Sequence, residues 1–240
     1  TLWARIEPLL ARVQKPARYI GCEDGALTPR HDKLDGGDVV AWLLAYPDTY
    51  EIGLPNQGLQ ILYELLNERD DALAERTYAP WADLDQEMRA AEVPLFSVDT
   101  HRAAAECDLL AFNLSSELVY TNVLNMIDLA GSPVRAAERN ADDLFVIVGG
   151  HAAFNPEPLA DFIDAAVLGE GEEVVSEITE VLHGWKAALS RGETTTRDDA
   201  LRRLARVPGV YVPSMYEVTY DEPAGDAPIG EIESVVPDGV

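Results

Sequence analysis

Three residues that follow the first strongly apolar stretch of the chain have side chains or spacing suited to binding a ligand. Asp48, Tyr50 and Gly53 stand in the order Asp-x-Tyr-x-x-Gly, directly after residues 39–46, which are apolar almost throughout. A short apolar stretch of this kind predicts a strand that is buried on both faces of a sheet. The phenol of tyrosine has an ordinary pKa near ~10 and is a poor metal ligand at neutral pH. This loop therefore offers hydrogen-bonding groups but no imidazole.

Two glycine-containing loops also follow predicted strands, and glycine leaves room where a side chain would obstruct a ligand. The first loop comes after residues 144–148 and the second after residues 165–168. Parallel strands place their carboxyl ends along one edge of a sheet, and such sheets bind ligands in the crevice at that edge. We therefore expect a binding crevice there, and its candidate residues are Gly149, Gly150, His151, Gly169 and Gly171.

A third group of polar residues surrounds the end of the strand predicted over residues 108–114. Asn113 can donate and accept hydrogen bonds, and Ser115 and Glu117 stand where the next helix is expected to begin, a position at which serine is a suitable N-cap. We include these three residues in the candidate site. The role of His151 stays open, because a loop histidine either contacts a ligand or is simply solvated.

The usual phosphate-binding sequences are missing. Neither Gly-x-Gly-x-x-Gly nor Gly-x-x-x-x-Gly-Lys-Ser/Thr occurs, so the sequence predicts neither a dinucleotide fingerprint nor a P-loop. Residues 169–173 read Gly-Glu-Gly-Glu-Glu and place three carboxylates at the start of a predicted helix, where they suit the helix dipole and repel a phosphate. This segment is either an acidic helix N-terminus or a backbone contact for a neutral ligand.

The composition limits the possible partners. The 240 residues carry 43 acidic and 18 basic side chains, with a formal net charge of −25. We expect no nucleic-acid partner, because phosphate contacts need clustered cations, and an anionic membrane is disfavoured likewise. No apolar stretch is long enough to span a bilayer and no signal peptide is evident, so we expect a cytoplasmic protein. Cys22 and Cys107 form neither a disulfide framework nor a metal-ligand spacing.

Predicted strands and helices alternate along the chain. Strands are expected over residues 39–46, 75–80, 108–114, 144–148 and 165–168, with amphipathic helices between and after them. This alternation predicts an α/β fold with a doubly wound, mostly parallel sheet of about five strands. The expected domains are an N-terminal helix and wrap over residues 1–38, an α/β domain over residues 39–192, and a linker over residues 193–240. We also expect a segment of a longer protein, because Thr1 is not an initiator and the tail closes no packed element.

A series of short sequences runs in order along the chain: Lys15-Pro-Ala-Arg-Tyr-Ile-Gly21, Tyr50-Glu-Ile-Gly-Leu-Pro-Asn-Gln-Gly58, Glu117-Leu-Val-Tyr-Thr-Asn-Val-Leu-Asn125, Asn155-Pro-Glu-Pro158, Gly169-Glu-Gly-Glu-Glu173 and Pro208-Gly-Val-Tyr-Val-Pro213. Together with Gly149-Gly150, they resemble the amino-terminal, cobalamin-binding-like domain of a large family of radical S-adenosylmethionine (SAM) proteins. The resemblance covers about residues 15–220.

The resemblance implies a Rossmann-like module of the cobalamin-binding type, placed ahead of a barrel that binds SAM and a 4Fe-4S cluster through a Cys-x-x-x-Cys-x-x-Cys site. The spacing at residues 48–53 is similar to the Asp-x-His-x-x-Gly motif of methionine-synthase-like cobalamin domains, with Tyr50 in place of the cobalt-ligating histidine. Asn113 stands where the family tends to have serine. No cysteine triplet occurs in this sequence, so the cluster and SAM are expected in the barrel.

Two functions are consistent with this resemblance. The first is a corrinoid-binding module of a radical SAM enzyme, by analogy a methyltransferase, that holds cobalamin over the candidate loops. The second is a Rossmann-like docking or substrate-positioning domain that no longer binds cobalamin, which Tyr50 and the acidic loop at residues 169–173 favour. A freestanding flavodoxin-like protein is a third alternative, and a cysteine triplet beyond residue 240 would exclude it.

Overall fold

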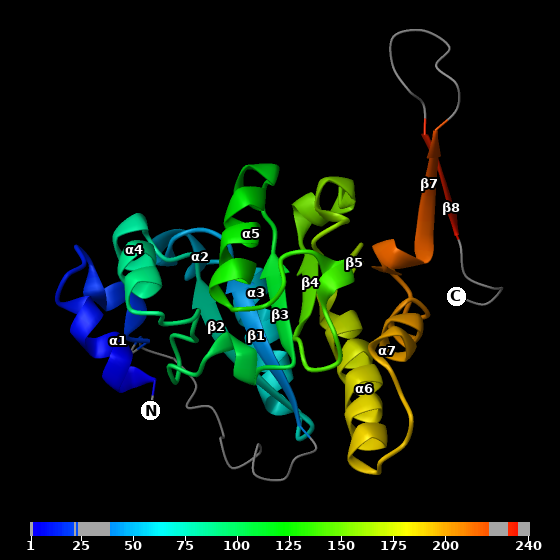
Figure 1. Cartoon of the computed structure of the whole chain (residues 1–240), viewed down its shortest axis with the longest axis horizontal. Coiled ribbons are helices and arrows are strands. Elements are labelled where there is room, and N and C mark those ends of the chain that lie inside the picture. The colour runs from blue at the N-terminus through cyan, green and yellow to red at the C-terminus, as the bar shows by residue number, and fades with distance from the viewer. Residues whose placement is uncertain (1, 22, 24–38, 221–229, 235–240) are drawn as a thin grey trace, which may run out of the picture.

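Six strands form one sheet in the computed structural model, which describes residues 2–21, 23, 39–220 and 230–234. The strands lie in the order β2-β1-β3-β4-β5-β6 (Figure 1). Strands β1 to β5 are parallel, and the two-residue β6 pairs antiparallel with β5. The strands are β1 (Val40–Tyr46), β2 (Ala72–Tyr78), β3 (Leu109–Asn113), β4 (Phe145–Gly149), β5 (Ala165–Val167) and β6 (Val210–Tyr211).

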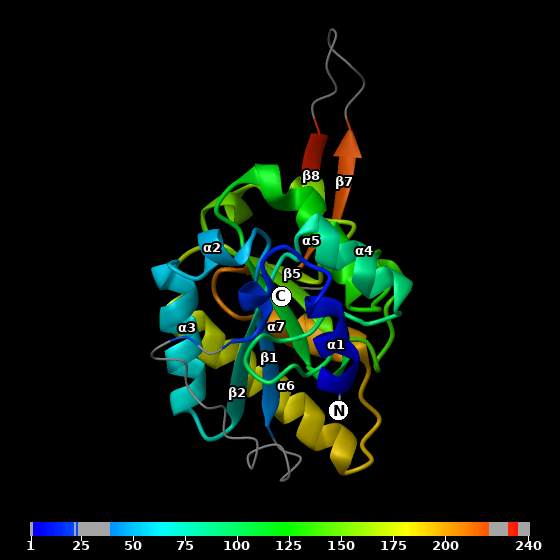
Figure 2. The same cartoon turned by 90° about the vertical axis from the view of Figure 1, so that its left-hand side faces the viewer.

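Helices cover both faces of this sheet, as its apolar composition requires. One face packs against α3 (Gln57–Glu68), α6 (Gly171–Ser190) and α7 (Arg197–Leu204). The other face packs against α1 (Trp3–Leu10), α4 (Ala82–Ala90) and α5 (Tyr120–Leu129), and Figure 2 shows α3 and α4 on opposite sides of the sheet. The predicted doubly wound α/β fold is therefore confirmed.

Alternation along β1 shows how one strand serves both cores. Trp42 and Leu44 belong to the core beneath α3 and α6, whereas Leu43 and Ala45 belong to the core beneath α4 and α5. All four side chains are buried, because successive residues of a strand point to opposite faces and both faces are covered.

The remaining elements are short. Helix α2 (Tyr50–Gly53) lies in the loop after β1, and β7 (Tyr216–Tyr220) pairs antiparallel with β8 (Gly230–Ser234). The 3₁₀ turns are η1 (Pro16–Tyr19), η3 (Ala104–Glu106), η4 (Glu117–Val119), η5 (Ala136–Glu138), η6 (His151–Phe154), η7 (Glu157–Leu159) and η8 (Pro213–Met215).

Several boundaries differ from those expected. The first helix, which the spacing of apolar residues predicts over residues 3–14, ends at Leu10 and has Pro8 in its last turn, where proline removes a backbone hydrogen-bond donor. Strand β2 begins at Ala72, before the expected residue 75, and lies at the edge of the described sheet. Of the expected wrap over residues 15–38, residues 22 and 24–38 lie outside the described part of the chain.

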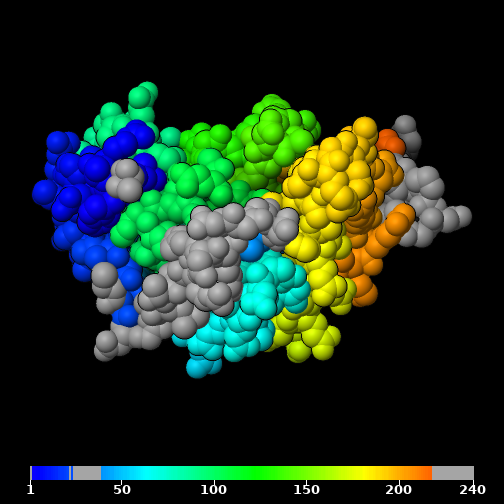
Figure 3. All heavy atoms as spheres, turned by 90° about the horizontal axis from the view of Figure 1, so that it is seen from below, coloured from blue at the N-terminus to red at the C-terminus, as the bar shows by residue number. Residues whose placement is uncertain are grey.

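The segment from α6 to β6 closes one end of the molecule. In the view from below, this segment (yellow to orange) lies at the opposite end from α1 (blue) (Figure 3). Helix α7 and strand β6 follow residue 192 and pack on the α/β sheet, while the proposed division of the chain into domains stays a prediction. None of the described helices is both long and apolar enough to cross a membrane.

A buried carboxylate ties three parts of the sheet together. Asp164, which is 3% exposed and precedes β5, accepts hydrogen bonds from Arg139 Nη1 at 2.8 Å and from Arg197 Nη2 at 3.0 Å. The same oxygen accepts from the backbone N–H of Val146 in β4 at 2.7 Å. Arg197 also lies over the ring of Phe145, with 4.0 Å between Cζ and the ring centroid. Asp164 thus links β4, β5 and α7.

Replacing this carboxylate should destabilise the fold strongly. We expect Asp164→Ala to lower the free energy of unfolding by about 3–5 kcal/mol, because two buried guanidinium groups lose their counter-ion. Asp161→Ala is the matched control. Its carboxylate is largely exposed and pairs with the exposed Arg135 at 2.9 Å, so its removal should change stability by less than about 1 kcal/mol. Urea unfolding followed by circular dichroism measures both, and equal effects would contradict the assigned role.

Candidate functional site

The strand order creates one crevice at the carboxyl edge of the sheet. Strand β1 has β2 on one side and β3 on the other, so the connections through α3 and α4 leave toward opposite faces. Open α/β sheets bind their ligands at such a point, and the order found here places it between β1 and β3.

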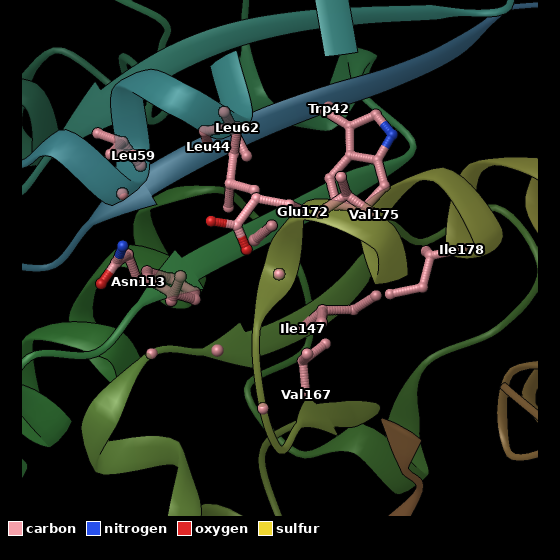
Figure 4. Close-up of a pocket in the computed structure, with 17 residues that line it drawn as sticks. Trp42, Leu44, Leu59, Leu62, Asn113, Ile147, Val167, Glu172, Val175 and Ile178 are labelled. Atoms are coloured by element: carbon pink, nitrogen blue, oxygen red, sulfur yellow. The ribbon is translucent and has the colours of Figure 1, made fainter. Parts of the chain in front are cut away.

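A cavity of about 190 Å³ lies next to this point, between the sheet and helices α3 and α6 (Figure 4). Strands β1, β4 and β5 supply its floor through Trp42, Leu44, Ile147 and Val167. Leu59 and Leu62 from α3 and Val175 and Ile178 from α6 close it from above. The lining is almost wholly apolar, so the cavity suits a neutral group.

Small residues explain why this part of the core is hollow. Ala111 in β3 and Gly149 in β4 occupy floor positions on the same face as the bulky Trp42 and Ile147. Gly58 and Gly171 stand in the first turns of the two covering helices. A side chain at Gly171 would press against Leu62, since its Cβ would lie 3.3 Å from a methyl carbon of that leucine.

The mouth of the cavity is built by close backbone approach. Gly150 has φ of +92°, and a Cβ there would lie 2.8 Å from the carbonyl oxygen of Leu114. That oxygen also accepts a hydrogen bond from the N–H of Ala152, and the N–H of Leu114 donates to Gly149. Only glycine fits this position without strain, so the ends of β3 and β4 can lie this close together.

Two polar side chains stand at the mouth. Asn113 donates from Nδ2 to Oδ1 of Asn56 at 3.3 Å, and the same oxygen caps α3 by accepting from the N–H of Leu59. Glu172 lies at the rim with its carboxylate beside Leu62, as Figure 4 shows. Deeper inside, the Trp42 Nε1–H donates to Thr179 Oγ1 at 3.1 Å and is therefore already satisfied. A ligand would find hydrogen-bonding groups at the mouth and apolar contact below.

The structure brings five of the predicted site residues together around this cavity. They come from β3, from the end of β4 and the loop after it, and from the segment that opens α6. These five are Asn113, Gly149, Gly150, Gly169 and Gly171.

The residues of the loop after β1 lie away from the cavity. Asp48 lines a separate groove of about 550 Å³ on the other face of the sheet, between α4 and α5, where it accepts a hydrogen bond from the N–H of Thr49. Gly53 packs beneath Tyr78, and a Cβ at Gly53 would lie 2.5 Å from that ring. This glycine permits close packing and has no contact with the cavity.

Tyr50 has a structural role through a hydrogen bond and ring packing. Its hydroxyl donates to Glu23 Oε1 at 2.6 Å, and its ring packs edge-on against Tyr78 with 5.3 Å between the ring centroids. Burial and the neighbouring Glu23 carboxylate raise the pKa of Tyr50 far above its ordinary value. The phenol therefore stays protonated at neutral pH, and its hydroxyl is engaged by Glu23.

The last three predicted residues are exposed at the same edge of the sheet. Ser115 Oγ lies 3.0 Å from the hydroxyl of Tyr46, while Glu117 opens η4 and His151 opens η6. The serine that caps η4 is Ser116, which accepts from the N–H of Leu118. None of these three residues lines the cavity, although all follow the strands that end at its mouth.

Sequence reasoning missed most of the cavity wall. Alternation along strands would have found part of it, since Trp42 and Leu44 are two residues apart, as are Ala111 and Asn113. The α6 residues that face the cavity follow three- and four-residue spacing, which a helical pattern also contains. No local pattern shows that these residues from separate strands and helices lie around one cavity. The lining residues that the sequence analysis did not select are Trp42, Leu44, Gly58, Leu59, Leu62, Ala111, Phe112, Ile147, Val167, Glu172, Val175 and Ile178.

Metal ligands are not grouped within the part of the chain that the structure describes. No set of three or more His, Cys, Asp or Glu side chains there could hold a metal ion.

Two neighbouring glycines at the mouth should respond differently to the same substitution. We expect Gly150→Ala to destabilise the chain by about 1–3 kcal/mol, because its backbone conformation disfavours a side chain and its Cβ would strike Leu114. Gly149→Ala should change stability by only about 0.5 kcal/mol, because its Cβ would lie 3.7 Å from Val167. Urea unfolding of both variants measures the difference, and equal stabilities would disprove the close approach at Gly150.

Comparison with known proteins agrees with this architecture. Residues 58–213 match the family described as radical SAM proteins, N-terminal, and this match spans more than half of the chain. The matched segment begins in α3 and ends after β6, so it includes most of the cavity wall. No curated protein and no solved structure matches the chain. Because the match covers the sheet from β2 to β6 together with the covering helices, the chain belongs to the family of N-terminal domains of radical SAM proteins.

Proposed function

We propose that this domain holds a corrinoid for the radical SAM domain of the same protein, with the planar base of the nucleotide tail in the cavity beneath α3 and α6. The observation that carries the proposal is the apolar cavity at the carboxyl edge, which opens at the glycine mouth between β3 and β4. Membership of the family implies SAM and a 4Fe-4S cluster in the radical SAM domain. A corrinoid would add a cobalt centre able to carry a methyl group, which makes the whole protein a methyltransferase in this proposal.

The size and the lining of the cavity support a base and exclude a whole corrin. Sites for drug-sized ligands measure roughly 300–1,000 Å³, whereas this cavity measures about 190 Å³. Trp42, Ile147 and Val167 offer apolar surface to a flat ring. The corrin itself would lie outside the cavity, over Gly149 and Gly150 at its mouth. The Asn113 amide is the nearest polar group for the rest of the tail.

The loop after β1 limits how cobalt can be held. Position 50 carries a tyrosine, which has no imidazole, and its hydroxyl is bound to Glu23. This position would therefore supply no imidazole to the cobalt of the proposed corrinoid. Such a cofactor would be retained through its tail and not through its metal.

A second function is favoured by two specific observations. Tyr50 is held by packing and a hydrogen bond, and the start of α6 carries Glu172 and Glu173 close to the mouth, where they oppose the phosphate of a nucleotide tail. Both observations suit a docking or substrate-positioning domain that accepts a neutral apolar group in place of cobalamin.

Retention of hydroxocobalamin tests the proposal. The chain is incubated with the cofactor and desalted exhaustively, and we expect stoichiometric absorption shifted from that of the free cofactor. Cobinamide, which lacks the nucleotide tail, should be lost on desalting because only the tail enters the cavity. A colourless protein after hydroxocobalamin would contradict corrinoid binding and support the docking function. Equal retention of both compounds would disprove the role of the cavity.

A substitution at the mouth links retention to the cavity. We expect Gly58→Leu to abolish retention, because its side chain starts 3.4 Å from Asn113 Nδ2 and extends into the mouth. Gly184→Leu is the matched control, since that exposed glycine of α6 has no atom within 4 Å of the added Cβ. Thermal unfolding of both variants checks that they are folded. Retention by a folded Gly58→Leu variant would rule out this site.

A further inference from the structure

The carboxyl edge of the sheet carries a row of exposed apolar side chains. Leu118 is 91% exposed, Phe154 66%, Ile52 54% and Trp81 49%, and these are the most exposed large apolar residues of the described chain. The cavity does not use them, and none of them lines it. We call these four residues the apolar row.

Their positions in the topology place them along one line. Ile52 lies in α2 after β1, Trp81 precedes α4 after β2, Leu118 lies in η4 after β3, and Phe154 lies in η6 after β4. Each of the first four parallel strands therefore ends in a loop that exposes one large apolar residue. Four adjacent strands span roughly 15 Å at the usual spacing between neighbours, so the row extends across most of the sheet edge.

Large apolar side chains exposed together on one surface mark an interaction site. The row follows the sheet order Trp81, Ile52, Leu118, Phe154, and the last two belong to the loops that follow β3 and β4, the strands that end at the mouth. A partner seated on the row would therefore contact the loops that follow β3 and β4.

The two strands that follow the matched family segment also support an interaction at the carboxyl edge. The family match ends at residue 213, and β7 and β8 then form a two-stranded ribbon. In Figure 1 this ribbon rises past the carboxyl edge beyond β5, at the end of the sheet that is far from α1. An isolated two-stranded ribbon is marginally stable in water. A neighbouring domain at the carboxyl edge would stabilise the ribbon and would also bury the apolar row.

We propose that the apolar row docks against the radical SAM domain of the same protein. Family membership supplies the occupant, since this chain is the N-terminal domain of radical SAM proteins. Exposed carboxylates lie close to the row in the chain at Glu117 and Glu157, so the facing surface should have an apolar centre and basic residues around it. This docking does not depend on a corrinoid, because the row lies outside the cavity.

Site-specific photocrosslinking in the full-length protein tests the docking. Benzoylphenylalanine replaces Leu118 in one variant and Leu189 in another. Leu189 is 39% exposed near the carboxyl end of α6, whereas the row lies in loops that follow the carboxyl ends of β1 to β4. After irradiation and mass spectrometry, we expect crosslinks from position 118 to peptides of the radical SAM domain, and few or none from position 189. Crosslinks from position 118 to a second copy, seen as a dimer on a denaturing gel, would overturn the proposal, as would a yield no higher than at position 189.

A double variant gives an independent measurement. We expect Leu118→Ser with Phe154→Ser to leave the full-length protein folded, because both side chains are exposed, and to speed protease cleavage between the two domains several-fold. Leu189→Ser should leave the cleavage rate unchanged. An unchanged rate in the double variant would count against docking at the row. No cobalamin is added in either experiment, so a negative result leaves the proposed corrinoid site untouched.

Discussion

Burial of the sheet on both faces is the constraint on which the rest of this structure depends. Strand β1 is buried at every residue, so helices must cover each face. The chain can cover both faces only if its connections leave in opposite directions somewhere along the sheet, and they do so between β1 and β3. The crevice at that point is therefore a consequence of how the core is closed.

The cavity beneath α3 and α6 shows how a core can remain hollow without losing its order. Protein interiors are normally packed to high density. Here the cavity lining includes four residues with little or no side chain, and the space that larger side chains would fill stays empty. They are Gly58, Ala111, Gly149 and Gly171. The surrounding framework is held by interactions elsewhere. The Trp42 indole is bound to Thr179, and Asp164 joins β4 and β5 to α7. Rigid walls around missing volume are the property expected of a binding site.

The loop after β1 illustrates that spacing alone does not define a site. Asp48, Tyr50 and Gly53 have the spacing of a cobalamin motif, but Tyr50 and Gly53 pack with Tyr78, and Asp48 faces a groove on the other side of the sheet.

The exposed apolar row and the glycine mouth lie at the same edge of the sheet. The proposed ligand binding and the proposed domain docking therefore involve the same edge.

The α/β class, the positions of most strands along the chain and the radical SAM family were determined by the sequence alone, because apolar runs, glycine-ended strands and short family sequences are local properties. Asn113, Gly149, Gly150, Gly169 and Gly171 could be selected in the same way, since each marks a strand end or a loop at the carboxyl edge. Only the tertiary structure decided that Trp42, Leu62 and Val175 meet around one cavity, and that Tyr50 does not reach it. It also decided that Val210–Tyr211 adds a sixth, antiparallel strand. These outcomes depend on which face each crossover takes and on pairing between distant segments, and no window of neighbouring residues contains that information.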